Sequence, residues 1–372
     1  MKILAIETSC DDTCSAIVEA KRGNSFKIIS SIISSQVKLH AKYGGVFPSL
    51  AKREHQKNLP IVVKKVLGLA KNPKIDLIAV TSGPGLEPCL WTGINFGKEL
   101  SEKMNLPIIP ANHIESHILA NIISKNLVFP AVCLIVSGGH TQIILAKEIG
   151  KYQILGETRD DAAGECFDKT ARILGLSYPG GPIISKKAAN LKNRKLNISL
   201  PRPMIYQKNY DFSFSGLKTA VLYDFKKRSL KERKSEQYIR EMSAEIQQTI
   251  IDVLIKKTLK AAKDCRAKSI VLSGGVSANK ELRKQFQKAV DSRMILSLPD
   301  EKLCTDNAAM VAVAGYFSWK KKKNWKKIEA NANLRITDEL SLNNFQKLTG
   351  LKKQKIKYIN SGSRPVFLIL TS

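Results

Sequence analysis

The chain has 372 residues, 43% of them hydrophobic and 25% charged, which favours two domains or two lobes around one cleft. It holds no run of about 18 apolar residues and no secretory signal pattern at its start, so we expect no membrane-spanning helix. Lys and Arg outnumber Asp and Glu by 61 to 32, a net charge of +29 that attracts nucleic acid but also arises from a bias toward Lys. The seven scattered cysteines indicate reduced thiols and a cytoplasmic protein.

The first predicted element is a hairpin, followed by strands that alternate with helices. In residues 2–20, two apolar strands flank a polar turn that carries Asp11 and Asp12. Three later apolar runs each end in Ser-Gly, where glycine lets the backbone approach a ligand and frees N–H groups for an anion. These runs are KIDLIAVTSGPG (74–85), AVCLIVSGGHTQ (131–142) and KSIVLSGGVSAN (268–279). Helical periodicity predicts helices at 49–70, 92–104, 112–125, 160–175, 236–264 and 306–318.

This alternation predicts an α/β fold. A hairpin-led unit followed by strand–SGG turns favours two related lobes that close on a phosphate-bearing ligand, as in actin, Hsp70 and the sugar kinases (the ASKHA fold). Ordinary tight turns are the alternative explanation of the glycines. We place the first lobe at 1–125, the second at 126–319 with a Lys-rich insertion at about 185–235, and a basic tail at 320–372. We expect this tail to be a solvated terminus rather than a grip on nucleic acid.

Two histidines stand out in the predicted helix 112–125. His113 and His117 are four residues apart, so they share one helix face and can reach one metal ion, and Asn112 can cap the helix. A zinc peptidase would need Glu directly after the first histidine. Here Glu115 lies about 200° round the helix from His113, so it cannot serve as that general base.

Asp306 is the candidate third ligand, at the head of the small-residue helix predicted from 306, although a helix N-cap is its ordinary role. Two histidines and one carboxylate with open positions suit iron(II) or zinc, of which we prefer iron(II). Open positions also allow a substrate oxygen to bind the ion. His40 and His55 have no such neighbours in sequence, and we expect them at the surface.

Seven motifs occur together in this order over residues 1–318, and in combination they are highly specific. They are ETSCDDT, NHIESHI, VSGGHTQ, DDAAGECFDKTARILGLSYPGGP, FSFSGLKTA, SGGVSANKELR and CTDNAAM. The chain thereby resembles the universal family of tRNA N6-adenosine threonylcarbamoyltransferases, in its bacterial and organellar form. A tyrosine that archaeal and eukaryotic relatives use as an extra metal ligand is replaced here by Ile135, which fits the bacterial pattern.

The resemblance implies an ASKHA-like fold and a reaction. The threonylcarbamoyl group of L-threonylcarbamoyladenylate moves to N6 of adenosine 37 in tRNAs that read codons beginning with A, which forms t6A and releases AMP. It also implies His113, His117 and Asp306 as metal ligands. The substrate-binding residues that the resemblance implies are Val136, Ser137, Gly138, Gly139, His140, Asp168, Gly181 and Asn279.

Direct attack by the amine on an activated anhydride needs no protein nucleophile, so we expect Cys166 and Ser137 to be positional. The resemblance further implies three partners: tRNA, a paralogous inactive subunit, and a small P-loop ATPase, because this chain has no G-x-x-x-x-G-K-[ST] run. A metal-dependent peptidase, a small-molecule kinase of the ASKHA type and a non-catalytic scaffold are the competing hypotheses.

Overall fold

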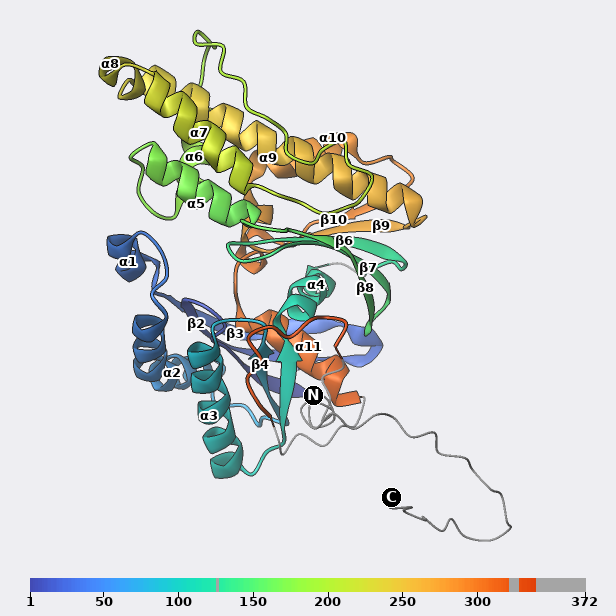
Figure 1. The fold of residues 1–372 in the computed structure, drawn as a ribbon. Coiled ribbons are helices and arrows are strands. Elements are labelled where there is room, and N and C mark those ends of the chain that lie inside the picture. The colour runs from blue at the N-terminus through green and yellow to red at the C-terminus, as the bar shows by residue number, and fades with distance from the viewer. Residues whose placement is uncertain (125–126, 321–327, 339–372) are drawn as a thin grey trace, which may run out of the picture. The chain divides into compact units, whose positions relative to one another are not determined.

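The computed structural model describes residues 1–124, 127–320 and 328–338, which include two five-stranded sheets (Figure 1). The strand orders are β3-β2-β1-β4-β5 and β8-β7-β6-β9-β10. In both sheets the first three strands are antiparallel, and the last two run parallel to the first. The first sheet comprises β1 (Lys2–Glu7), β2 (Asp12–Ala20), β3 (Phe26–Ser35), β4 (Leu77–Gly83) and β5 (Ile108–Asn112). The second comprises β6 (Ala131–Val136), β7 (Thr141–Glu148), β8 (Lys151–Glu157), β9 (Ser269–Ser273) and β10 (Ile295–Ser297).

Helices cover both faces of each sheet. Because side chains alternate along a strand, Ile3 and Ala5 of β1 face one layer while Leu4 and Ile6 face the other. The helices that precede the second sheet are α1 (Val37–His40), α2 (Pro48–Leu69), α3 (Glu87–Met104) and α4 (His113–Ser124). Those that follow β8 are α5 (Ala163–Ile173), α6 (Gly180–Ala189), α7 (Ser215–Lys227), α8 (Leu230–Arg233), α9 (Glu236–Asp264), α10 (Lys280–Ala289) and α11 (Ala308–Lys320).

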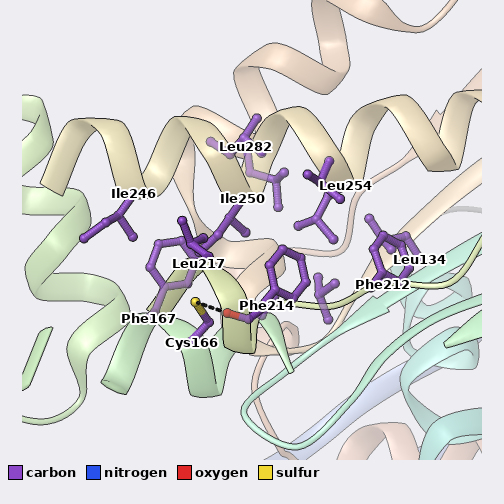
Figure 2. Packing of buried hydrophobic residues seen from close by; sticks show 14 of the residues in the cluster. Leu134, Cys166, Phe167, Phe212, Phe214, Leu217, Ile246, Ile250, Leu254 and Leu282 are labelled. Carbon is purple, nitrogen blue, oxygen red and sulfur yellow. Dashed lines mark hydrogen bonds between the residues drawn. The ribbon is translucent and has the colours of Figure 1, made fainter. Parts of the chain in front are cut away.

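The outer face of the second sheet carries the largest apolar cluster of the described residues. Figure 2 shows Leu134 of β6 with Phe212 and Phe214, and Ile250 and Leu254 of α9 packed above them. Each of these side chains is fully buried, and complete burial of a side chain of this size stabilises the fold by about 1.5–3 kcal/mol. The same cluster includes residues of α5, α6 and α10 and so fixes the helices on or beside which Asp168, Gly181 and Asn279 lie.

Helices α4 and α11 cross between the two sheets (Figure 1). Leu119 and Ile122 of α4 pack in the cluster that joins α11 to the first sheet. Ile114 and Ile118 of the same helix pack against the second sheet, beside Ile135. His113 and His117 lie in the first turns of α4, and Asp306 lies just before α11. Packing of α4 on both sheets and of α11 on the first sheet therefore fixes the predicted metal ligands.

All six predicted helices are present, with starts that differ by up to five residues. The sequence did not predict α1, α6, α7, α8 and α10, which have 4 to 13 residues and each contain at least one Lys. In the described part of the chain, no helix has the length and apolar character needed to cross a bilayer. All seven cysteines are unpaired, as expected.

The lobe boundaries stay a prediction. One observation bears on them: α11, the last helix of the predicted second lobe, packs against the first sheet. Residues 328–338 of the predicted tail pack on the fold, because Ile328, Leu334 and Ile336 are buried and Asn331 donates its N–H to the Ser82 carbonyl at 2.8 Å. The prediction of a solvated terminus is therefore wrong for this segment, and residues 321–327 and 339–372 of the predicted tail, with the apolar PVFLIL, lie outside the described residues.

Candidate functional site

The two predicted histidine ligands lie side by side on α4. Asn112 caps this helix as expected, because its Oδ1 accepts the N–H groups of Ile114 at 2.9 Å and Glu115 at 3.1 Å. The ring centroids of His113 and His117 are 4.7 Å apart, with the rings nearly perpendicular. Both side chains are buried, so the pair is held in one orientation by its surroundings.

Asp306 completes the cluster from the loop before α11. It is not the cap of that helix, because the N–H of Met310 donates to Asn307 Oδ1 at 3.0 Å. The Asp306 Oδ1 atom lies 3.1 Å from His117 Nε2 and 3.5 Å from His113 Nε2. One ligand atom from each of the three residues falls within 4.8 Å of the others. Two imidazoles and a carboxylate at this spacing fit a borderline divalent ion.

A second carboxylate, which the sequence did not assign, orients His113. Glu7 ends β1, and its Oε2 lies 3.0 Å from His113 Nδ1 while accepting the Thr81 hydroxyl at 2.7 Å. The N–H of Ser9 donates to the other Glu7 oxygen at 2.5 Å, and Ser9 Oγ lies 3.2 Å from His113 Nδ1. Metal-binding histidines commonly bond their second nitrogen to a carboxylate in this way. A glutamate directly after the apolar run KILAI was the available sequence signal.

The cluster is strongly coupled electrostatically. Burial lowers the pKa of His113, but the charges of Glu7 and Asp306 outweigh burial and raise this pKa to about 9. Burial raises the pKa of Asp306, but His113 and His117 hold it well below its usual range. The buried Glu7 carboxylate and the half-buried Asp306 carboxylate thus share the charge of one imidazolium, which leaves a site that favours cations.

The glycine turn that follows β6 leaves its glycines accessible. Two hydrogen bonds hold the turn together, because the Ser137 N–H donates to the His140 carbonyl at 2.8 Å and Ser137 Oγ accepts the His140 N–H at 3.1 Å. Gly138 and Gly139 are exposed, and a Cβ on either would meet no atom within 4 Å. The backbone between Val136 and His140 is therefore accessible to a ligand, as the sequence predicted.

The glycine turn also lies next to the metal ligands. The ring centroid of His140 is 6.4 Å from that of His113. Burial, together with the charges of His113 and His117, lowers the pKa of His140 to about 4. This imidazole is consequently neutral at physiological pH, so one ring nitrogen can donate a hydrogen bond and the other can accept one.

The other three predicted substrate residues lie at or beside helix N-termini. Asp168 Oδ1 accepts the Gly180 N–H at 2.7 Å, which links it to the first turn of α6, where Gly181 lies. Burial raises the Asp168 pKa, and those N–H groups offset only part of the rise. Asn279 caps α10 through the Leu282 N–H at 3.0 Å. Asn279 and Asp168 share no hydrogen bond with each other among the described residues.

His40 and His55 are both fully buried, so the prediction of surface positions is wrong. They belong to a polar chain in which His40 Nε2 lies 3.0 Å from Gln36 Oε1. His55 contacts the Thr13 hydroxyl at 2.8 Å and the Cys10 carbonyl at 2.9 Å. These partners, which are distant in sequence, are what allow two imidazoles to be buried.

Glu115 takes no part in the metal cluster, as predicted from its place on the helix. Its Oε1 accepts the Tyr152 hydroxyl of β8 at 3.0 Å. Glu115 is therefore not placed to act as a peptidase general base at the metal cluster.

The fold and site together define a protein of the ASKHA class with a site suited to a metal ion. Solved structures support this fold. HypF from T. kodakarensis matches with a TM-score of 0.55 at 13% identity, over 86% of this chain and 48% of that one. A full-length HypF in its phosphate- and nucleotide-bound form matches at 0.53 and 12%, over 89% and 47%. At such low sequence identity these matches show the fold alone, and they confirm the predicted fold class.

Sequence comparisons identify the family. A sequence model of the tRNA N6-adenosine threonylcarbamoyltransferases matches residues 27–313. A protein of that description from Thermosipho africanus is 48% identical over 341 residues, 90% of this chain and 100% of its own. Those of Thermosipho melanesiensis and Bacillus subtilis are 49% and 44% identical, over 85% and 86% of this chain and 94% and 91% of their own. The chain belongs to this family, which confirms the resemblance.

Proposed function

We propose that the chain transfers the threonylcarbamoyl group of L-threonylcarbamoyladenylate to N6 of adenosine 37 in tRNAs reading codons that begin with A. A bond forms between N6 and the carbamoyl carbon, the bond from that carbon to the phosphate oxygen breaks, AMP leaves, and N6 loses a proton. Family membership supports the reaction and tRNA as substrate. The observation that carries the site is the buried cluster of His113, His117 and Asp306 beside an open glycine turn.

His113, His117 and Asp306 would hold one divalent ion, iron(II) by preference or zinc. When bound, such an ion supplies a Lewis acid for donor oxygens. Glu7 keeps the His113 ring in place and favours its cation-binding orientation. We assign this role to Glu7 as a positioning residue, because its carboxylate faces His113 Nδ1 rather than the three ligand atoms.

The donor would be bound by the remaining predicted residues. Backbone N–H groups of the turn from Val136 to His140 suit the phosphate or carbamoyl oxygen of the donor. They can donate hydrogen bonds to such an oxygen without a charged side chain, and no bulky side chain blocks its approach. Asp168, Gly181 and Asn279 would contact the ribose and the base. The backbone N–H groups of the turn, held in fixed positions, would offset the negative charge that develops on the leaving AMP.

Covalent catalysis is not supported by the cysteine that follows the DDAAGE motif. Cys166 is fully buried, and its Sγ donates to the Phe214 carbonyl at 3.7 Å (Figure 2). Burial holds the pKa of this thiol well above its usual range, so a reactive thiolate is disfavoured. Direct attack by the adenosine amine is the simpler route.

We also propose that the chain works in the cytoplasm with a paralogous inactive subunit and a small P-loop ATPase. Its sequence has no phosphate-binding P-loop, which supports an external source for any ATPase step. The unpaired cysteines support the reducing compartment.

Mass spectrometry of tRNA nucleosides tests the function. An unmodified tRNA reading an ANN codon is incubated with the donor, the partner proteins and either the wild-type chain or His113→Ala. We expect threonylcarbamoyladenosine with the wild type and a rate at least about 100-fold lower with the variant. Glu115→Gln, on the same helix, is the matched control and should keep the wild-type rate.

Three outcomes contradict parts of the proposal. No product with partners proven active on another family member would refute the reaction. Full activity of His113→Ala would remove the histidines from the mechanism. If the wild type cleaves a peptide substrate and Glu115→Gln does not, the result would instead support the metal-dependent peptidase.

A further inference from the structure

Two aromatic side chains lie exposed between α1 and α2. Tyr43 and Phe47 have exposed fractions of 64% and 54%, and their rings stack with centroids 6.1 Å apart and an angle of 26° between the planes. They belong to residues 41–47, which we name the aromatic turn. Large rings exposed in water and already stacked form a flat surface that suits a planar ligand.

The surroundings of the aromatic turn are strongly basic. Residues 36–75 contain nine Lys or Arg against a single acidic residue, Glu54. Of these basic residues, Lys38, Lys42, Lys52 and Arg53 are exposed and lie within six residues of the aromatic pair in sequence. None of the four makes an ion pair or a hydrogen bond with another described residue. Their charges are therefore available to an anionic partner.

The aromatic turn contacts the helix that carries one of the predicted substrate residues. The Arg172 guanidinium donates a hydrogen bond to the Gly44 carbonyl, and Arg172 lies on α5, the helix that carries Asp168. On its inner side, the N–H of Phe47 donates to His40 Nδ1 at 3.3 Å. The turn is thus anchored both to the second sheet's helices and to a buried histidine.

The buried polar chain continues from His40 toward the metal ligands. Gln36 contacts His40 through its side chain, and its N–H donates to the Asp11 carbonyl at 3.0 Å. Cys14, on the strand that follows this turn of the hairpin, donates its thiol to the Asp306 carbonyl at 3.5 Å. Hydrogen bonds and short stretches of chain therefore connect the aromatic turn with the metal cluster.

We propose that Tyr43 and Phe47 stack on bases of the tRNA anticodon loop that flank the target adenosine, while the four basic residues contact its phosphates. This inference rests on the proposed function for the identity of the RNA. Proteins that bind single-stranded RNA combine exposed aromatic rings with unpaired cations, because bases stack and phosphates need positive charge. The core of a protein interface is depleted in Lys, which makes a protein partner the weaker match.

Fluorescence anisotropy tests the proposal. A labelled anticodon stem-loop with unmodified adenosine 37 is titrated with the full-length chain, in the absence of donor. The double variant Tyr43→Ala, Phe47→Ala should bind at least about tenfold more weakly, because each stacked base contributes substantially to affinity. The swap Tyr43→Phe, Phe47→Tyr should bind as the wild type does, since it keeps both rings.

A matched control distinguishes this surface from general stickiness. Tyr206 is 87% exposed and lies under the Lys256 ammonium group, 4.1 Å from it, so Tyr206→Ala removes an exposed aromatic beside a cation elsewhere. It should leave RNA affinity unchanged. Lys42→Gln with Lys52→Gln should lower the slope of log Kd against log salt by about 0.7 for each phosphate that the two lysines neutralise in the wild type.

Several outcomes would overturn the inference. These are wild-type failure to bind the stem-loop, equal affinity of the double alanine variant, or loss of binding to the paralogous subunit while RNA affinity stays intact. The last result would make the turn a protein interface. A wild type that binds RNA but transfers nothing refutes the proposed function alone, whereas full transfer and RNA binding by the double variant refutes only this inference. Equal melting temperatures confirm that the variants fold.

Discussion

The two sheets have the same strand order, yet their corresponding hairpin turns carry opposite chemistry. The turn between β1 and β2 begins after Glu7 and includes Ser9, both of which contact the metal-ligand cluster. The turn between β6 and β7 is Ser-Gly-Gly-His and presents open backbone. One architecture thus supplies fixed charge from the first sheet and backbone donors from the second.

This difference follows from what each turn must hold. A cation needs carboxylates and imidazoles that packing keeps apart from water, so the first turn is buried against α4. A phosphate or carbonyl oxygen needs N–H groups without a side chain in the way. The corresponding ends of β4 and β9 differ less, because both carry a glycine in close contact with another segment.

The largest expected effect is on stability at the end of β9. Gly274 has φ +88°, and a Cβ there would collide with the Val136 carbonyl oxygen. Gly274→Ala should lower the free energy of unfolding by about 2–4 kcal/mol, from strain and overpacking together. Chemical denaturation measures this change. A stability equal to wild type would show that the end of β9 tolerates a side chain beside the Val136 carbonyl.

The next effect concerns the charge supplied by the first turn. Glu7→Gln keeps the shape of the side chain but removes the charge facing His113, and should weaken metal affinity by about 10- to 100-fold. Calorimetric titration of the metal-free chain with zinc or iron(II) measures it. Ser9→Ala is the milder control. If Glu7→Gln binds the metal as tightly as Ser9→Ala and the wild type do, Glu7 has no orienting role.

A smaller effect tests the openness of the second turn. Gly138→Ala adds a Cβ that meets nothing within 4 Å, so the melting temperature should stay within about 1 °C of wild type. The KM for the donor should rise about tenfold, because the added methyl group lies where the backbone approaches the ligand. Steady-state kinetics separates the two readouts. An unchanged KM would remove the turn from donor binding.

The smallest effect depends on pH at the first turn. Burial, with some help from Asp11, raises the pKa of Asp12 to about 7, despite a hydrogen bond from Ser35. The folded state therefore binds more protons than the unfolded state between about pH 4 and 7, and stability falls as pH rises through this window. Asp12→Asn should remove that fall and gain about 1 kcal/mol at pH 8, with little gain at pH 4. Melting curves at several pH values would contradict this if the gain were constant.

Local patterns predicted much of this protein. Asn112 caps α4 as its residue type suggests, and the four-residue spacing brings His113 beside His117, because helix geometry is set within one turn. The glycine turn after β6 is open because glycine has no side chain. Failures occurred where the helical stripe was short or Lys-rich, as in α10, whose apolar face is only Leu282 and Phe286.

The sequence by itself determined six of the helices, the α/β class and the three candidate metal ligands, since these depend on short-range spacing and on motifs that mark the family. Only the tertiary structure decided that Glu7 faces His113, that His40 and His55 are buried, and that residues 328–338 return to the end of β4. Each of these depends on contacts between residues far apart in the chain. A polar side chain can be buried only where a distant partner satisfies it, and no local pattern specifies that partner.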